Sequence, residues 1–134
     1  GQTIEMLKAD RRLAAREYAA RIQAVCVLKD ASTVTADSDG HVWINASGCS
    51  AMAKGGSGDV LAGVIGSLLA QGMERTEAAA LGVYLHGLMG EHAAERQGDK
   101  GVLARDLANA FFISQEIASY ETKTLREVAE CQWH

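Results

Sequence analysis

Residues 53–72 read AKGGSGDVLAGVIGSLLAQG, a glycine-rich segment that leads directly into an apolar stretch. The large apolar residues of this stretch recur at helical spacing: Val60, Leu61, Val64, Ile65, Leu68 and Leu69. The positions between them hold only Ala, Gly and Ser, which predicts a helix that is buried nearly all round. Such a helix needs other layers to cover it, so the flanking segments determine the fold.

Three short runs of β-type residues precede the glycines. They are AVCVLK (24–29), TVTAD (33–37) and HVWIN (41–45), separated by the turn-forming segments DAS and SDG. The first run is continuously apolar, which predicts a strand covered on both faces. The second and third runs are joined by a short polar turn and predict a hairpin at a sheet edge.

Helices are predicted on both sides of these strands. Residues 3–22 have the pattern of an amphipathic helix, with apolar positions at Met6, Leu7, Leu13, Ala14, Tyr18 and Ile22. A later helix carries Gly82, Gly87 and Gly90, which would let another element approach closely. A further helical region starts near Leu103.

The order of the predicted elements is typical of an α/β layered fold with about three strands and four to five helices. Sheets in such folds usually have about five or six strands, and three strands cannot cover this many apolar helices. We therefore expect residues 1–134 to form a single partial domain, with about half of the sheet lying elsewhere.

Composition and charge exclude some classes of function. The chain has 134 residues, 48% of them hydrophobic and 22% charged, as in globular domains. Thirteen basic residues against 17 acidic ones give a net charge of −4, which argues against general affinity for nucleic acid or an anionic membrane. No apolar run is long enough to span a bilayer. Cys26, Cys49 and Cys131 match neither a disulfide framework nor a zinc pattern, which indicates a reducing cytoplasm.

No metal-binding site made of protein side chains is predicted. His86 and His92 are six positions apart, so they do not share a helix face as paired metal ligands would. We expect both to be packed or surface histidines.

The glycine-rich turn has the features of an anion-binding site. Gly56, Ser57 and Gly58 expose backbone amides at the start of a predicted helix, where the helix dipole also favours an anion. Asp59 follows at once, and a carboxylate there suits a base that takes a proton from a hydroxyl during phosphoryl transfer. The sequence of this turn matches neither the Walker motif nor the dinucleotide-binding motif. The structural alternative is a tight turn with Asp59 stabilising the helix N-terminus.

The wider pattern resembles a known family. NASGCSAMAKGGSGDVLAGVIGSLLAQG (45–72), AAALGVYLHGLMGEHAAERQG (78–98) and GVLARDL (101–107), together with VLKDAST (27–33) and TIEM (3–6), resemble the ADP-dependent NAD(P)H-hydrate dehydratases of the ribokinase-like superfamily. The resemblance covers roughly residues 1–112 and depends on the order of five segments. It implies the C-terminal half of a ribokinase-like α/β sandwich.

The resemblance also implies a reaction. ADP, with Mg²⁺ expected as its companion ion, phosphorylates the C6 hydroxyl of hydrated NADH or NADPH, and elimination of phosphate restores the double bond and leaves AMP. Asp59 would contact the substrate and act as base, while Gly58 would contact the nucleotide. The nucleotide segment of the family maps onto Lys29, Asp30, Ala31, Ser32 and Thr33.

Two positions depart from the family pattern. Asp30 replaces a glycine, which should weaken nucleotide binding unless its carboxylate turns away. Gln2 replaces a substrate-contacting histidine and can form hydrogen bonds but cannot carry a proton. Two alternatives therefore stay open: a ribokinase-like kinase that uses ATP, and a non-catalytic fragment that binds nucleotide or a partner chain. A homo-oligomer, or an N-terminal half supplied separately, is the expected assembly.

Overall fold

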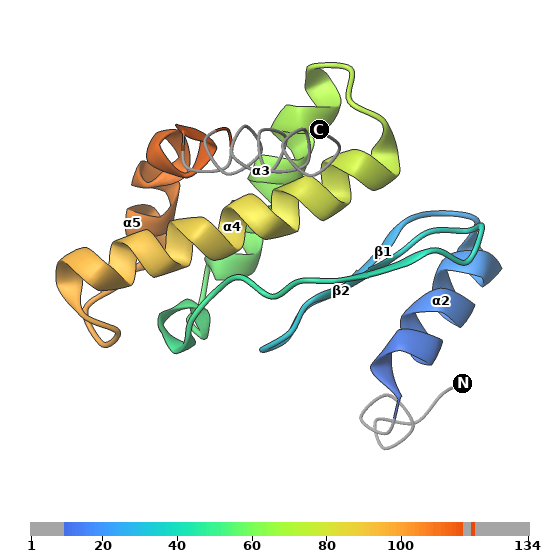
Figure 1. The fold of residues 1–134 in the computed structure, drawn as a ribbon, viewed down its shortest axis with the longest axis horizontal. Coiled ribbons are helices and arrows are strands. Elements are labelled where there is room, and N and C mark those ends of the chain that lie inside the picture. The colour runs from blue at the N-terminus through green and yellow to red at the C-terminus, as the bar shows by residue number, and fades with distance from the viewer. Residues whose placement is uncertain (1–9, 117–118, 120–134) are drawn as a thin grey trace, which may run out of the picture.

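The computed structural model describes residues 10–116 and 119. Its elements follow in the order α2 (Arg11–Ile22), β1 (Cys26–Leu28), β2 (Val34–Ala36), β3 (Val42–Ile44), the short 3-10 helix η1 (Ser50–Met52), α3 (Ser57–Ala70), α4 (Arg75–Gln97) and α5 (Ala104–Asn109). The strands and α2 lie at one end of the molecule, and α3, α4 and α5 gather at the other (Figure 1). This order matches the sequence-based prediction, although residues 3–9 of the first predicted helix lie outside the described residues.

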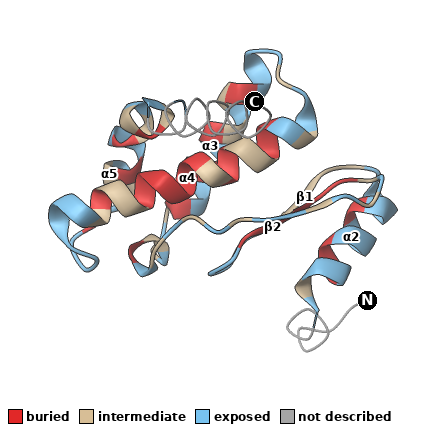
Figure 2. Cartoon of the chain, viewed as in Figure 1, coloured by how far each residue is buried: buried red, intermediate tan, exposed pale blue. Residues whose placement is uncertain are grey.

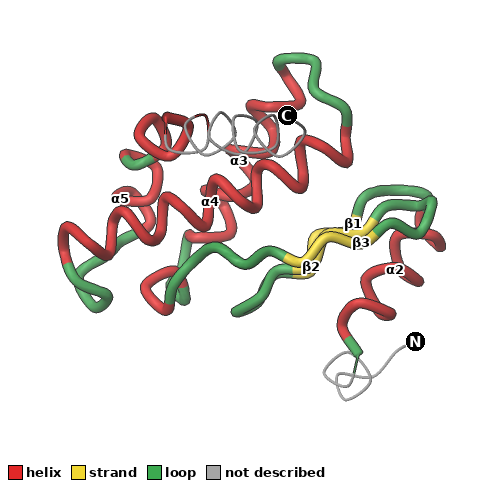
Figure 3. Tube along the Cα trace, in the orientation of Figure 1, coloured by secondary structure: helices red, strands yellow, loops and turns green. Residues whose placement is uncertain are grey.

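The three strands form an antiparallel sheet in the order β1-β2-β3 (Figure 3). Cys26 pairs with Ala36, and Val34 pairs with Ile44, so the predicted hairpin of the second and third strands is confirmed. The prediction for the first strand was wrong. β1 is a half-buried edge strand, whereas all three residues of β2 are buried. The reason is that β2 has a partner on each side and also contacts both α2 and α4.

Helix α2 packs through small side chains. Asp10 caps its N-terminus by accepting hydrogen bonds from the amides of Arg12 and Leu13. The buried residues of α2 are all alanines: Ala14, Ala15 and Ala19. The larger apolar residues that the sequence placed on the buried face are exposed, with Leu13 at 42%, Tyr18 at 46% and Ile22 at 45%. Alanines let the helix approach the sheet closely, and no described element covers the other face.

Helices α3 and α4 pack against each other along much of their length (Figure 1). The predicted close approach at the α4 glycines is confirmed, because a Cβ on Gly82 would lie 2.6 Å from Ile65 Cγ1. The expectation that α3 is buried all round was wrong. The ribbon of α3 has both buried and exposed parts (Figure 2). Leu61, Val64 and Leu68 face the core, while Ala62, Gly63, Gly66, Leu69 and Ala70 are exposed.

Two clusters of buried apolar residues result. The larger one joins η1 and the three helices α3, α4 and α5, and it includes Leu68, Leu85, Met89, Val102 and Leu107. The smaller one lies between α2 and the sheet and contains Ala15, Ala19, Val34 and Ala36. The segments between the two clusters position the candidate site.

Candidate functional site

The glycine-rich turn opens helix α3 as the sequence predicted. Gly56 is the N-cap residue with φ +85°, a conformation that favours glycine, and Ser57 is the first residue of the helix. A Cβ on Gly56 would lie 2.9 Å from Ala104 Cβ, so the start of α5 also leaves no room for a side chain. Gly58 and Asp59 are exposed in the first helical turn. The carboxylate of Asp59 therefore faces solvent rather than packed hydrocarbon.

The amides of this turn are not equally available. The Ser57 amide donates to the Lys54 carbonyl at 3.3 Å, and the Val60 amide donates to the Gly56 carbonyl at 3.1 Å. The amides of Gly56, Gly58 and Asp59 have no acceptor within the described part of the chain. An anion at this helix N-terminus would thus meet Gly56, Gly58 and Asp59 rather than Ser57.

Lys54 links the glycine-rich turn to the loop between α4 and α5. Its Nζ donates to the backbone carbonyls of Asp99, Lys100 and Val102, in the loop between α4 and α5. Ser50 Oγ reaches the same loop and donates to Asp99 Oδ2 at 2.8 Å. The three donors of the Lys54 ammonium are accounted for by these carbonyls, so the lysine has a structural role.

A cavity of about 730 Å³, which we call the Lys29 cavity, extends as far as Ala53, and Gly56, Ser57, Gly58 and Asp59 do not line it. Its walls come from residues 29–33, residues 45–53 and the middle of α4. Of the predicted nucleotide segment, Lys29, Asp30, Ala31 and Thr33 line it, whereas Ser32 is exposed and does not. Their contact with nucleotide stays a prediction. The volume is in the range of about 300–1,000 Å³ that is usual for small-molecule sites.

The Asp30 side chain is 65% exposed at the cavity, and its carboxylate is paired within the chain. Its Oδ2 lies 2.9 Å from Arg11 Nη1, and its Oδ1 accepts a hydrogen bond from the Ala31 amide at 2.9 Å. Arg11 also donates to the Leu28 carbonyl at 3.2 Å, which anchors the guanidinium to β1. The negative charge that departs from the family pattern is therefore paired within the chain.

Helix α4 supplies the rear wall of the cavity. Ser47 Oγ donates to the Tyr84 carbonyl at 3.0 Å, and the Gly48 amide donates to Glu91 Oε1 at 2.6 Å. A Cβ on Gly87 would lie 2.0 Å from Ser47 Oγ, and one on Gly90 would lie 2.3 Å from Met52 Cγ. The predicted close approach at these two glycines is confirmed, and it places residues 45–52 against the helix.

His86 connects the cavity with the glycine-rich turn. The imidazole is 2% exposed, lines the Lys29 cavity, and has its Nε2 2.9 Å from the Ser57 carbonyl oxygen. Because a carbonyl only accepts, Nε2 carries a hydrogen and donates it. Burial lowers the pKa of His86; the hydrogen bond to Ser57 opposes this shift and the charge of Lys29 adds to it, so the ring is neutral near pH 7.

The sequence predicted a packed or surface histidine at position 86, and the buried side chain confirms the first of these. Its contact with Ser57 and its place in the cavity lining were not predicted. The available signal was its position in an apolar, glycine-rich helix, where a polar side chain needs a hydrogen-bond partner. Its partner Ser57 lies 29 residues earlier, which local spacing does not reveal.

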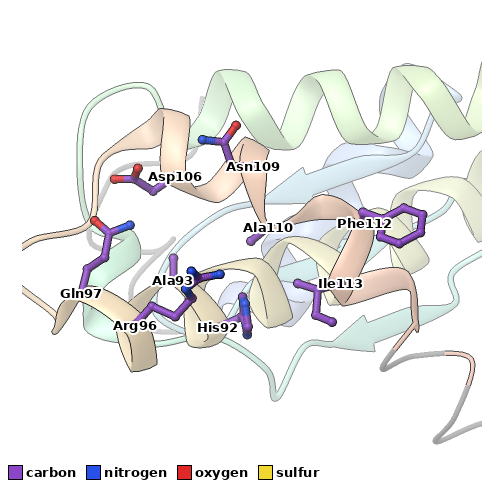
Figure 4. A pocket seen from close by; sticks show the side chains of 9 residues that line it. All are labelled: His92, Ala93, Arg96, Gln97, Asp106, Asn109, Ala110, Phe112 and Ile113. Atoms are coloured by element: carbon purple, nitrogen blue, oxygen red, sulfur yellow. The ribbon is translucent and has the colours of Figure 1, made fainter.

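Two other features lie outside this site. A cavity of about 630 Å³ beside the end of α4 and α5 has both polar and apolar lining residues, which include His92, Arg96, Asn109, Phe112 and Ile113 (Figure 4). Ligand atoms of Asp37, Asp39 and His41 lie within 4.8 Å of one another. Although burial opposes ionisation, hydrogen bonds from His41 and Asp39 lower the pKa of Asp37, and these bonds shape the β2–β3 hairpin.

Within residues 10–116 and 119, no helix has the length and hydrophobicity required to cross a membrane. Cys26 and Cys49 are free thiols. Gln2, predicted to contact substrate, lies outside the described residues.

Comparison with known proteins places this geometry in a family. The family profile described as NAD(P)H-hydrate dehydratase matches residues 1–112. The bifunctional NAD(P)H-hydrate repair enzyme Nnr of Moorella thermoacetica is 48% identical over 107 residues, which are 80% of this chain and 20% of that protein. The ADP-dependent (S)-NAD(P)H-hydrate dehydratase of Neisseria meningitidis is 43% identical over 111 residues, which are 82% of this chain and 38% of that enzyme.

A solved structure agrees with these relatives. The crystal structure of the ADP/ATP-dependent NAD(P)H-hydrate dehydratase from Bacillus subtilis, co-crystallised with ATP/Mg²⁺ and soaked with CoA, matches with a TM-score of 0.79 and 36% identity. The match covers 84% of this chain and 42% of that structure, so the chain spans less than half of the relatives it resembles. The predicted ribokinase-like α/β fold is confirmed by this match. On sequence and fold together, the chain belongs to the NAD(P)H-hydrate dehydratase family.

Proposed function

We propose that this chain carries the nucleotide side of an ADP-dependent dehydratase that converts hydrated NADH or NADPH back to NADH or NADPH. ADP donates its terminal phosphoryl group to the C6 hydroxyl of the hydrate and leaves as AMP. The C6–O bond then breaks, the phosphate departs with that oxygen and its electron pair, and C5 loses a proton as the ring double bond forms again. Family membership supports this reaction for the complete enzyme, and the Lys29 cavity, whose lining residue His86 contacts Ser57 of the turn, supports it for this chain.

The roles of the residues follow from their chemistry. Lys29 offers a point charge to the phosphates of ADP, and Thr33 and Ala31 border the nucleotide. The free amides of Gly56 and Gly58 would stabilise the transferring phosphoryl group, with the first turn of α3 behind them. Ser57 contributes through its position rather than its amide, which is already bonded to Lys54.

Asp59 is the proposed base. Its carboxylate is exposed at the helix N-terminus next to the free amides, where it can reach a hydroxyl of a bound substrate. Gln2 stays a proposed substrate contact and Ser32 a proposed nucleotide contact.

Mg²⁺ fits this arrangement as an ion carried by the nucleotide. Near the cavity the carboxylate of Asp30 is paired with Arg11 and that of Glu91 accepts the Gly48 amide, so neither is a free ligand. Mg²⁺ commonly binds through phosphate oxygens and water with few protein ligands. When bound, it would neutralise phosphate charge during transfer. We also propose action in the cytoplasm, which the free thiols of Cys26 and Cys49 support.

The test is to incubate the 134-residue chain with hydrated NADH and either ADP or ATP, and to follow AMP release and the return of NADH absorbance. We expect ADP to support both signals. The Asp59→Asn variant should bind ADP with unchanged Kd but lose at least about 100-fold in turnover, as removal of a general base typically does.

Other outcomes select the alternatives. ATP consumption with formation of ADP and a phosphorylated product that keeps its phosphate would identify a kinase. Binding of ADP without turnover by the wild-type chain would identify a nucleotide-binding fragment. Unchanged turnover in Asp59→Asn would exclude Asp59 as the base.

A further inference from the structure

His86 of α4 is a buried polar residue that contacts the first turn of α3. Its side chain is 2% exposed, and α4 around it is formed by Leu85, Gly87, Leu88 and Met89, all of them buried. A polar group in such surroundings is costly unless it is hydrogen-bonded. The bond of His86 goes to the Ser57 carbonyl at 2.9 Å, with Ser57 Oγ 3.3 Å away.

That carbonyl belongs to the peptide group whose amide is Gly58 N–H. All described peptide bonds are trans, so this carbonyl and this amide point in opposite directions within one rigid plane. A donor that holds the Ser57 carbonyl on the core side therefore also sets the direction of the Gly58 amide. That amide lacks an acceptor within residues 10–116 and 119 and lies at an exposed position.

The hydrogen bond from His86 matters because the restrained peptide ends at a glycine, Gly58. Gly58 has no side chain, and a Cβ built there would meet nothing within 4 Å, so only the first turn of α3 and contacts to the backbone itself orient this peptide. Glycine also loses more conformational freedom on folding than any other residue. The buried imidazole on α4 adds a restraint on this peptide from outside helix α3.

We propose that His86 is a positioning residue, whose Nε2–H holds the Ser57–Gly58 peptide so that the Gly58 amide faces the phosphate of a bound nucleoside diphosphate. The proposal rests on the proposed function, in which Gly58 contacts that phosphate. The neutral state of the ring fits the role, because a neutral donor orients the peptide without competing with the Gly58 amide for the anion.

Two substitutions of His86 by amide side chains distinguish the position of the donor nitrogen from the mere presence of a polar group. In His86→Gln, the donor nitrogen is three bonds from Cβ, as Nε2 is in histidine, whereas in His86→Asn the same amide group is one bond shorter. We expect Gln to keep the bond to Ser57 and Asn to lose it. His92→Asn, on the same helix but lining the other cavity, is the matched control.

The first measurement needs no nucleotide. ¹⁵N relaxation should give the Gly58 amide an order parameter near 0.85 in the wild-type chain, His86→Gln and His92→Asn, and a value falling toward about 0.6 in His86→Asn. The second measurement is ADP affinity by calorimetry. His86→Asn should raise Kd about fivefold, the size expected for one neutral hydrogen bond, while the other two variants stay within about twofold of wild type.

The outcomes separate this inference from the proposed function. If the wild-type chain binds no ADP, the proposed function fails, yet the order parameter still tests the restraint. Equal order parameters and affinities in the Gln and Asn variants, whether both retained or both lost, overturn the positioning role of His86. Thermal unfolding of each variant establishes that the comparison is between folded chains.

Discussion

Asp30 shows how one residue that departs from the family pattern is accommodated. Its carboxylate lies at the rim of the Lys29 cavity but is paired with Arg11 at 2.9 Å, while Arg11 is also bonded to the Leu28 carbonyl. Both partners keep some contact with water, so the pair itself adds little to stability. Its consequence for function is larger, because an unpaired carboxylate there would repel the phosphates of a nucleotide.

Removing the arginine should therefore weaken nucleotide binding. We expect Arg11→Ala to raise the Kd for ADP about two- to fivefold at low salt, and less at higher ionic strength, because screening reduces exposed charge interactions. Adding Asp30→Asn to Arg11→Ala should restore affinity, since the repelling charge is then gone. Calorimetric titration at two salt concentrations measures both effects.

Arg12→Ala is the matched control for this pair. It removes the same charge from the next position of the helix but leaves the contact between Arg11 and Asp30 intact. An equal loss in Arg12→Ala, or no recovery in the double variant, would show that Asp30 does not oppose the nucleotide.

At the scale of single residues, the sequence predicted best those features that depend on a few consecutive residues. Gly56, Gly58 and Asp59 begin a helix because glycine conformation and the helix N-terminus can be recognised over a few positions. The use of the Ser57 amide by Lys54 and the contact from His86 were missed. Both depend on how the turn closes and which distant helix packs behind it, and neither is encoded in local spacing.

Among the elements, α4 determines the shape of the site. Its glycines admit Ile65 on one side and Ser47 and Met52 on the other, so that one helix contacts both α3 and the loop that lines the Lys29 cavity. The buried cluster around Met89 and Leu85 fixes the helix at the same time.

The glycine at position 87 should be intolerant of a side chain. In Gly87→Ala, the new Cβ would lie 2.0 Å from Ser47 Oγ and 2.8 Å from the Ser47 carbonyl carbon, so the loop must move. We expect the free energy of unfolding to fall by about 1–3 kcal/mol, as for other overpacked sites, and ADP affinity to fall as well. Urea denaturation and calorimetry measure the two quantities.

Gly66→Ala provides the comparison on α3. A Cβ at position 66 meets nothing within 4 Å, so the substitution should raise stability by about 0.5–1 kcal/mol, the usual gain for alanine over glycine in a helix. Destabilisation of similar size in both variants would mean that close contact with Ser47 is not the cause.

The order and approximate positions of the elements were predictable from sequence, but their burial was less so. The three strands appear where short apolar runs alternate with turn residues, and the helices follow their periodicity. The buried faces were misjudged where small residues make the contacts. Ala15 and Ala19 of α2 are buried while Leu13 is exposed, because the closeness of helix and sheet, rather than hydrophobicity alone, selects the inner face.

At the scale of the whole molecule, the two apolar clusters differ in the side chains that they bury. The larger cluster contains leucines, valines and a methionine, whereas the cluster between α2 and the sheet holds three alanines and one valine. Alanine contributes much less hydrophobic free energy than leucine because it removes less apolar area from water. The prediction of a single partial domain fits relatives that are more than twice as long, and it stays a prediction.

This difference should be visible in hydrogen exchange. We expect amides of β1 and β2 to exchange at least about tenfold faster than those in the middle of α4, because the alanine cluster opens before the larger one. Lys29 and Thr33 belong to the less stable part, so ADP should slow exchange there most, by up to about 100-fold at a concentration 100 times Kd.

Ala19→Gly should speed exchange in the sheet and leave α4 unchanged, whereas Ala20→Gly, which alters an exposed position of the same helix, should have a smaller effect. Uniform exchange rates across both clusters would show that the chain opens as one cooperative unit and that nucleotide binding does not stabilise the sheet selectively.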